Sequence, residues 1–257
     1  MTMRYYPVHL DIQNRNCLVV GGGGVGTRKV ATLLDCGAKV TVISPVVSQQ
    51  LRDFAISGLI KLRERSYQSG DLDGMFLVIG ATDDEELNRQ ISSDAEHLNT
   101  LCNIADRPEV CNFILPAIVQ REDLVITIST SGKSPALAKQ LRQTLEYQFG
   151  KEYGIFLKLM GAVRKRLLSQ THEPEAHKHL FEQLIAADLI TMIREEKTEA
   201  INSLLFEILG RGYRYLIAMI REENTEAINA LLFEVLGQGY RYDELMQRSG
   251  SVTPSDA

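Results

Sequence analysis

The strongest chemical signal in the sequence is the glycine-rich run GGGGVG at residues 21–26. Gly21, Gly23 and Gly26 match the pattern G-x-G-x-x-G. In this pattern the first glycine makes a tight turn, the second lets a pyrophosphate approach the backbone, and the third lets a helix pack closely on a strand. The pattern alone is weakly specific, but here it follows an apolar run and opens a helical pattern. We therefore predict dinucleotide binding, with a glycine turn that holds no ligand as the alternative.

A second part of the dinucleotide fingerprint, an acidic residue after the next strand, is missing. The apolar run from Lys39 ends in Ile43, Ser44 and Pro45, where an acidic side chain would normally hold the ribose hydroxyls. Ser44 offers one hydrogen bond at this place. No cluster of arginines follows to hold the 2′-phosphate of NADP, so the sequence favours NAD.

One carboxylate stands where an enzyme of this kind could use it. Asp106 and Arg107 follow the apolar run 101–104. Because ligands collect beyond the carboxyl ends of parallel strands, we expect Asp106 near the nicotinamide side of the crevice, where a carboxylate can accept a proton. A turn capped by Asp106, or an ion pair with Arg107, explains the pattern equally well from the residues alone.

A third signal is the hydroxyl-rich loop STSGKS at residues 129–134. Free amides at the start of the following helix, together with Lys133, predict an anion-binding loop that includes Thr130 and Ser134. Helix capping explains Ser134 nearly as well. The loop lacks the earlier glycine of G-x-x-x-x-G-K-[ST], so it is not a nucleotide P-loop.

Tyr147 and Lys151 form the pattern Y-x-x-x-K, which short-chain dehydrogenases use together with an upstream serine. Chance produces this pattern easily. The glycine motif of those enzymes would also need a further glycine where Arg28 stands, so this interpretation is the weaker one.

The histidines at positions 172, 177 and 179, with Glu173 and Glu175, form a possible metal cluster. Helical spacing places Glu175 and His179 on one face but not the other members. A solvated charged face is therefore favoured, and we assign no metal ligand.

The elements that must position these residues alternate along the chain. Strands are predicted for the apolar runs 16–20, 39–43, 75–79, 101–104 and 124–128, and helices for 27–36 and 83–98. Such alternation is typical of an α/β fold with a doubly wound, Rossmann-like parallel sheet. After Pro135 a helix continues to residue 149, and from about residue 155 the pattern is all-helical.

The helical region contains a tandem repeat, because residues 189–215 and 216–242 are contiguous and nearly identical. In the first copy a helical stripe ends at Gly210; it consists of Ile201, Leu204, Leu205, Ile208 and Leu209. Two copies are too few for a solenoid, so the repeat predicts packing helices inside a helical domain of residues 151–247, before a flexible tail of residues 248–257. A subunit contact is the alternative role.

Composition excludes several classes of protein. The 257 residues include 28 Lys+Arg and 33 Asp+Glu, and the formal net charge of -5 argues against nucleic-acid binding. No apolar run approaches the ~18 residues of a membrane span, and the N-terminus lacks the apolar stretch of a secretory signal. The four cysteines form no CxxC pair, which suits reduced thiols in a cytoplasmic protein.

Four segments together resemble the precorrin-2 dehydrogenase and sirohydrochlorin ferrochelatase family of siroheme synthesis. In order between residues 4 and 149 they read YYPVHLDIQNRNCLVVGGGGVGTRKVATLLDCGAKVTVISP, ATDDEELN, LCNIADRPEVCNFILPA and ISTSGKSPALAKQLR. The opening Tyr6-Pro7 and the N-F-I-L-P-A segment are especially specific, because a general dinucleotide fold requires neither.

The resemblance implies NAD-dependent oxidation of precorrin-2, a tetrapyrrole, to sirohydrochlorin, and in some members insertion of Fe2+ to give siroheme. It also implies a homodimer, with residues 113–150 as the dimerisation segment after an NAD-binding domain of residues 1–112. The methyltransferase that is fused to some members is not expected in a chain of this length.

The resemblance also assigns residues by position. Asp106 matches the aspartate assigned to both activities. Candidates to hold the carboxylates of the substrate are Arg107, Lys133 and the amides before Ala136. The residues expected against NAD or in its crevice are Gly24, Val25, Pro45, Val46, Thr82 and Asn103. Thr130 departs from the family, which often has serine there, so regulation by serine phosphorylation is not expected.

The main alternative function is a non-catalytic NAD-sensing module.

Overall fold

The computed structural model describes residues 5–170, 174–210, 213 and 217. Contacts divide the chain into two compact units. The first contains Met1–Ala117 and Ser129–Ala138, and the second contains Ile118–Ile128 and Lys139–Ala257. Residues 113–150, the expected dimerisation segment, are thus shared between the units, and their role in a dimer stays a prediction.

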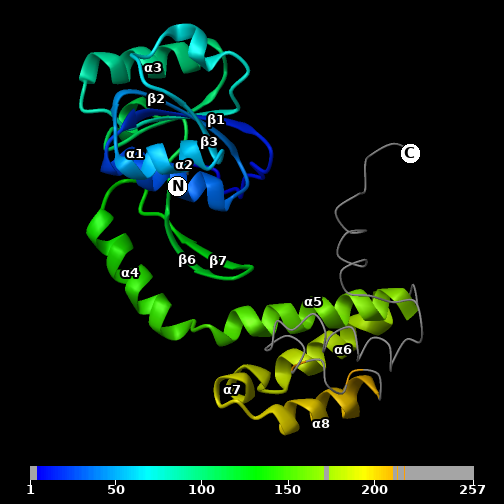
Figure 1. The fold of residues 1–257 in the computed structure, drawn as a ribbon. Helices are drawn as coiled ribbons and strands as arrows, with labels where there is room; N and C mark the ends of the chain where they lie inside the picture. The colour runs from blue at the N-terminus through cyan, green and yellow to red at the C-terminus, as the bar shows by residue number, and fades with distance from the viewer. Residues whose placement is uncertain (1–4, 171–173, 211–212, 214–216, 218–257) are drawn as a thin grey trace. The chain divides into compact units, whose positions relative to one another are not determined.

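The first unit is built on a five-stranded parallel sheet with the order β3-β2-β1-β4-β5 (Figure 1). Its strands are β1 (Asn16–Gly22), β2 (Lys39–Val47), β3 (Ile60–Arg63), β4 (Leu77–Gly80) and β5 (Leu101–Ile104), and its helices are α1 (Gly24–Asp35), α2 (Gln49–Ile56) and α3 (Glu85–His97). The strand order reverses between β1 and β4, which is where open α/β sheets bind ligands. The predicted Rossmann-like fold is confirmed.

Helices cover both faces of this sheet because successive strand residues point to opposite sides. Val19 and Val42 pack on one face against Val30 of α1 and Leu51 of α2. Leu18, Val20 and Val78 face the other side and pack against Ile91 and Ala95 of α3. Figure 1 shows α1 and α2 on one side of the sheet and α3 on the other.

The structure corrects two predicted elements and adds two strands. The run 124–128 does form a strand, β7 (Leu124–Ile128), but it pairs with β6 (Ala117–Arg121) in a separate two-stranded sheet and does not join the parallel sheet. β3 and β6 were not predicted; the alternation in these short, half-exposed segments is too weak to separate them from loops. α1 begins at Gly24 and not at Thr27, because the glycine-rich segment is itself the first helical turn.

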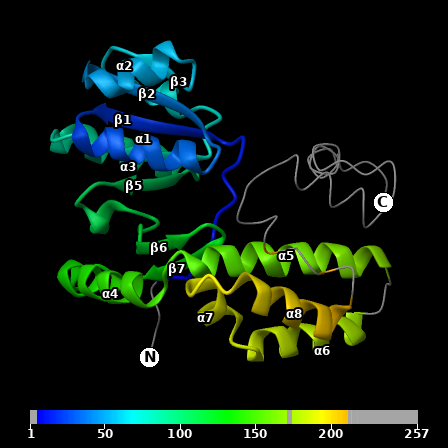
Figure 2. The ribbon, with the colours of Figure 1, turned by 60° about the horizontal axis from the view of Figure 1, so that its bottom comes forward.

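The second unit is mainly helical (Figure 2). After α4 (Pro135–Gln148), which starts in the first unit, come α5 (Glu152–Gln170), α6 (Pro174–Ala186), α7 (Leu189–Arg194) and α8 (Thr198–Leu209). The first repeat copy supplies α7 and α8, and Ile201 and Leu205 of its predicted stripe are fully buried against Leu159 and Val163 of α5. Most of the second copy and the tail of residues 248–257 lie outside the described residues.

No helix in the described part of the chain is long and apolar enough to cross a membrane.

A buried carboxylate holds the edge of the parallel sheet. Asp71, in the short 3-10 helix η1 (Ser69–Leu72), accepts hydrogen bonds from Arg65 at 2.5 and 2.8 Å and from Arg63 at 3.1 Å. Its side chain is only 4% exposed. The hydrogen bond from Arg65 is the main cause that keeps the pKa of Asp71 below its usual value.

We predict that Asp71→Asn lowers the free energy of unfolding by about 2 kcal/mol, because it removes the charged acceptor of the hydrogen bonds from Arg63 and Arg65. Denaturant unfolding measures the loss. The native contribution of Asp71 is present above the pKa that this carboxyl has in the unfolded chain, and disappears as the pH falls through its lower folded pKa. Glu64→Gln, which removes the exposed partner of Arg52, is the control, with an expected change within about 0.5 kcal/mol. Equal effects of the two variants would contradict the prediction.

Candidate functional site

The glycine-rich turn packs too closely on its neighbours to carry side chains at two positions. At Gly21, where φ is +120°, an added Cβ would lie 2.1 Å from the carbonyl oxygen of Ala81. At Gly26 it would lie 2.1 Å from the carbonyl oxygen of Gly21. These two glycines therefore join β1, α1 and the turn after β4 into one tight backbone cluster.

Gly23 and Gly24 have the opposite environment. An added Cβ would meet nothing within 4 Å at either residue, so both backbones face open space. Gly23 is the N-cap of α1, and no side chain caps the helix. The first amides of a helix have no partners within it and carry a partial positive charge, so this open N-terminus suits an anionic group such as a pyrophosphate.

The end of β2 bulges beside this turn. Val20 pairs with Ile43 and Gly22 pairs with Val47, so the β2 segment between these pairs is two residues longer than the β1 segment. The Ser44 hydroxyl donates to the carbonyl of Val46 at 2.7 Å, which fixes the bulge and turns the hydroxyl toward the backbone. Val46 is 77% exposed beside the glycine-rich turn. We infer that Ser44 shapes this wall of the site through the backbone, while Pro45 and Val46 present its surface.

A cleft of about 240 Å³ lies beyond the carboxyl ends of the strands. It is formed by the start of α1, the turn after β4, the start of α3 and the turn after β5. Its lining residues are Val25, Ala81, Thr82, Asp83, Glu85, Asn88, Ala105, Asp106 and Arg107. The structure thus brings Asp106 into one cleft with Val25 of the glycine-rich segment and with Thr82.

Asp106 is exposed and occupies the left-handed backbone region, with φ +61°. Its charge acts on Lys29 of α1, which is half-buried. Burial, and then the charge of Arg28, lowers the pKa of Lys29, and the carboxylate of Asp106 partly opposes the decrease. The carboxylate of Asp106 therefore acts on an ammonium group at this end of the sheet.

Arg107 points its guanidinium at a carboxylate from the same cleft. It forms an ion pair with Glu85 of α3, and a carboxylate oxygen of Glu109 lies 3.9 Å from its Nη1. All three side chains are about half-exposed, so the pairing is weak and exchangeable.

Comparison with known proteins agrees with this geometry. A family model described as putative NAD(P)-binding matches residues 8–117, and one described as sirohaem biosynthesis protein central matches residues 121–148. A siroheme synthase of Methylococcus capsulatus is 37% identical over 202 residues, which cover 77% of this chain and 43% of that protein. The chain belongs to the precorrin-2 dehydrogenase and sirohydrochlorin ferrochelatase family.

Further relatives support the family assignment. A siroheme synthase of Nitrosococcus oceani is 36% identical over 211 residues, 82% of this chain and 45% of that protein. The solved structure of SirC, precorrin-2 dehydrogenase, is 27% identical, with a TM-score of 0.61, and the match covers 85% of this chain and 96% of that one. The chain spans less than half the length of these two siroheme synthases.

Two crevice residues expected from the family make mainly structural contacts. The Asn103 amide nitrogen donates to the carbonyl of Phe113 at 3.1 Å, and the residue is only 8% exposed and absent from the cleft lining. Thr82 does line the cleft, but its hydroxyl accepts the Asp84 amide at 3.1 Å. We infer that Asn103 supports the crevice from behind.

The side chains of the hydroxyl-rich loop form hydrogen bonds within the loop and at the start of the next helix. Thr130 Oγ1 accepts the Ser134 amide at 3.2 Å, and Ser134 Oγ accepts the Leu137 amide at 3.2 Å at the start of α4. Lys133 is exposed, and none of these residues lines the 240 Å³ cleft. Capping accounts for Ser134, and contact of the loop with substrate stays a prediction.

The short-chain dehydrogenase pattern is not assembled. Tyr147 is 92% exposed, and α4 ends at Gln148, before Lys151. The two side chains therefore do not share a continuous helix. Of the possible metal cluster, His172 lies outside the described residues, His177 is buried and His179 is exposed. No group of His, Cys, Asp or Glu suited to a metal ion occurs in the part of the chain that the structure describes.

Several residues around the cleft were missed in the sequence. Asn88 of α3 donates to the carbonyl of Thr82 at 2.9 Å, and its Oδ1 is buried without a partner among the described atoms. Thr27 donates to the carbonyl of Gly23 at 2.9 Å and lies 2.8 Å from the Ser48 hydroxyl, so it ties the turn to α2. The position of Thr27 directly after the glycine-rich motif is a sequence signal that could have identified it. Asn88 and Lys29 have no such signal in the sequence.

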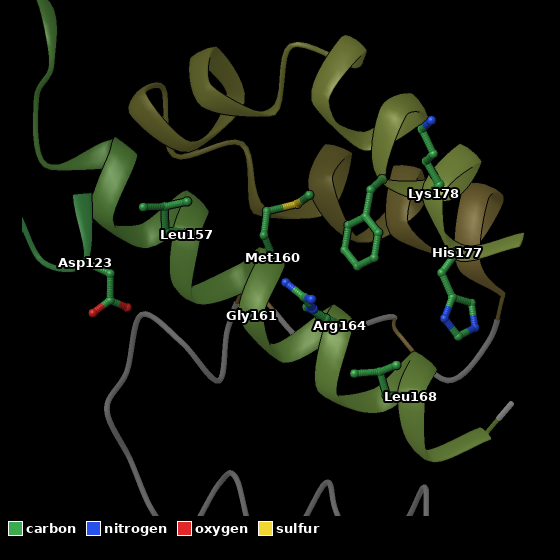
Figure 3. A pocket seen from close by; sticks show the side chains of 9 residues that line it. Asp123, Leu157, Met160, Gly161, Arg164, Leu168, His177 and Lys178 are labelled. Carbon is green, nitrogen blue, oxygen red and sulfur yellow. The ribbon is translucent and has the colours of Figure 1, made fainter. Parts of the chain in front are cut away.

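A second cleft, of about 480 Å³, lies in the helical unit between α5 and α6 (Figure 3). Leu157, Met160 and Phe181 give it an apolar wall, and Arg164 and Lys178 bring positive charge. Of the residues singled out in the sequence it contains His177, to which no function was assigned.

We predict that Gly23→Ala weakens NAD binding at least about tenfold, because its methyl group projects into the space that a pyrophosphate needs. The thermal midpoint should change little. Gly26→Ala is the contrasting variant, since its methyl group overlaps the Gly21 carbonyl and should lower stability directly. NAD titration and thermal unfolding of both proteins separate the two roles; unchanged NAD affinity in folded Gly23→Ala would contradict the assignment.

Proposed function

We propose that this protein oxidises precorrin-2 to sirohydrochlorin with NAD as the hydride acceptor. The observation that carries the proposal is the cleft shared by Asp106 and the open N-terminus of α1. The names of the siroheme synthases and of SirC, precorrin-2 dehydrogenase, support it.

The residues of the first unit fit a bound dinucleotide. The amides at the start of α1 would hold the pyrophosphate over Gly23 and Gly24, where the space is open. Pro45 and Val46 would flank the adenosine half, and Val25 the entrance to the cleft. When bound, NAD supplies the site that receives the hydride.

Asp106 would accept the proton that accompanies hydride loss. Oxidation of precorrin-2 removes a hydride and a proton, so the enzyme needs a base beside the macrocycle as well as the hydride acceptor. The carboxylate of Asp106 is exposed in the cleft, where a substrate proton can reach it. The same carboxylate could accept pyrrole N–H protons as Fe2+, a substrate, enters sirohydrochlorin.

The substrate carboxylates would be held by local cations, since the chain as a whole is acidic. Arg107 would exchange Glu85 for a substrate carboxylate, and Lys133, Thr130 and Ser134 would bind others. We further propose a homodimer in which residues 113–150 contribute to the contact.

We predict that Asp106→Asn abolishes conversion of precorrin-2 and leaves NAD affinity unchanged, because the amide keeps the shape of the side chain but cannot act as a base. The absorption change to sirohydrochlorin measures turnover. Asp83→Asn, which removes a second carboxylate from the same cleft, should have a much smaller effect. Undiminished turnover in Asp106→Asn would refute the proton-acceptor role, and NAD binding without any conversion by the unchanged protein would favour an NAD sensor.

The ferrochelatase activity has its own test. Anaerobic sirohydrochlorin and Fe2+ are mixed with the unchanged protein and with Asp106→Asn, and the spontaneous rate is subtracted. We expect the unchanged protein to accelerate insertion and the variant to lose the acceleration. A rate equal to the spontaneous one in both cases would limit the protein to dehydrogenation.

A further inference from the structure

The segment 111–113 caps the exposed edge of the parallel sheet. Asn112 donates its amide to the carbonyl of Cys102 at 3.2 Å, and its Oδ1 accepts the Cys102 amide at 2.8 Å. Its side-chain nitrogen donates to the carbonyl of Thr100 at 2.9 Å. Asn112 therefore satisfies the backbone of β5 much as a neighbouring strand would, because an edge strand leaves these groups unpaired.

Cys111 extends the cap beyond the end of β5, into the turn that carries Asp106. Its sulfur accepts the amide of Ile104 at 3.1 Å, and its S–H donates to the carbonyl of Arg107 at 3.1 Å, with the Ile104 carbonyl as a longer alternative acceptor at 3.4 Å. The side-chain amide of Asn103 also donates to the sulfur, at 3.7 Å. The residue is only 8% exposed. Burial raises the pKa of the Cys111 thiol, so the proton needed for donation is retained.

Asp106 lies between the two residues that the thiol holds. Its positive φ is uncommon for a residue with a side chain, and the turn is closed by a long bond from the Arg107 amide to the Ile104 carbonyl at 3.3 Å. Backbone bonds hold its two ends, from the Ala105 amide to the Gly80 carbonyl at 2.8 Å and from the Val110 amide to the Arg107 carbonyl at 3.2 Å. The contacts of the buried Cys111 side chain add to these backbone bonds on both sides of Asp106. The direction of the Asp106 carboxylate depends on that backbone.

We propose that Cys111 is a positioning residue, whose thiol holds the Ile104–Arg107 turn so that the Asp106 carboxylate stays in the cleft. The inference rests on the proposed proton-acceptor role of Asp106. The thiol does not touch substrate or cofactor; it acts through the turn.

The test compares three substitutions at position 111 in the full chain. Cys111→Ala and Cys111→Val remove every hydrogen bond of the thiol, and Val fills the volume in case the smaller side chain impairs folding. We expect kcat for precorrin-2 to fall about ten- to a hundredfold in both, because a small displacement of a catalytic group is costly. Cys111→Ser keeps a donor and an acceptor and should recover most of the activity. NAD affinity should stay unchanged in all three.

Asn112→Ala is the matched control, because it removes contacts of the same segment to β5 but none to the Asp106 turn. It should lower the thermal midpoint without lowering kcat per folded molecule. The pH profile adds a readout that stability does not move: displacement of Asp106 shifts the acidic limb of kcat/KM in Cys111→Ala or Cys111→Val, whereas Asn112→Ala leaves it in place.

Three results would overturn the inference: kcat within about twofold of the unchanged protein in the folded variants without the thiol, an equal loss in Asn112→Ala, or a parallel loss of NAD affinity. The outcome for Asp106→Asn keeps the two proposals apart. If that variant is inactive while Cys111→Val is fully active, only the positioning role fails. If Asp106→Asn is itself active, the proposed proton acceptor fails first.

Discussion

The contact between the glycine-rich turn and the turn after β4 determines where every other part of the site lies. Gly21 sits so close to the Ala81 carbonyl, and Gly26 so close to Gly21, that a methyl group at either would overlap backbone. This packing brings the N-terminus of α1 beside the carboxyl ends of β4 and β5. Without it, the helix start and Asp106 could not share one cleft.

The cleft carries charges of both signs, since Asp83, Glu85 and Asp106 are carboxylates and Arg107 is a guanidinium. Arg107 is paired with Glu85 at the surface, where the pair is easily exchanged, and the charge of Asp106 acts on the half-buried Lys29. Positive charge is thus available locally.

The segment that covers the edge strand β5 both completes the hydrogen bonding of that strand and contacts the turn of Asp106. A further strand would satisfy β5 uniformly, but here the side chains of Asn112 and Cys111 do so, and the second reaches the turn of Asp106. The N-F-I-L-P-A segment that distinguishes this family begins in that cap. The segment supports an edge strand next to the proposed site, and this role explains why it is specific to the family.

The sequence by itself determined the fold class and the approximate place of the site. Glycine spacing, the apolar runs of β1, β2, β4 and β5, and Asp106 after β5 all depend on local periodicity, which a sequence displays directly. The family resemblance added the reaction. β7 could be predicted as a strand but not placed, because pairing depends on partners far along the chain.

Only the tertiary structure decided what individual side chains face. Ser44 turns to its own backbone, Asn103 to Phe113 and Ser134 to the start of α4, although each had a residue type suited to a ligand. Glu85, Asn88 and Cys111 enter the site region from other segments. A polar side chain bonds to whatever group the folded chain brings within about 3 Å, and that distance is set by packing between segments remote in sequence.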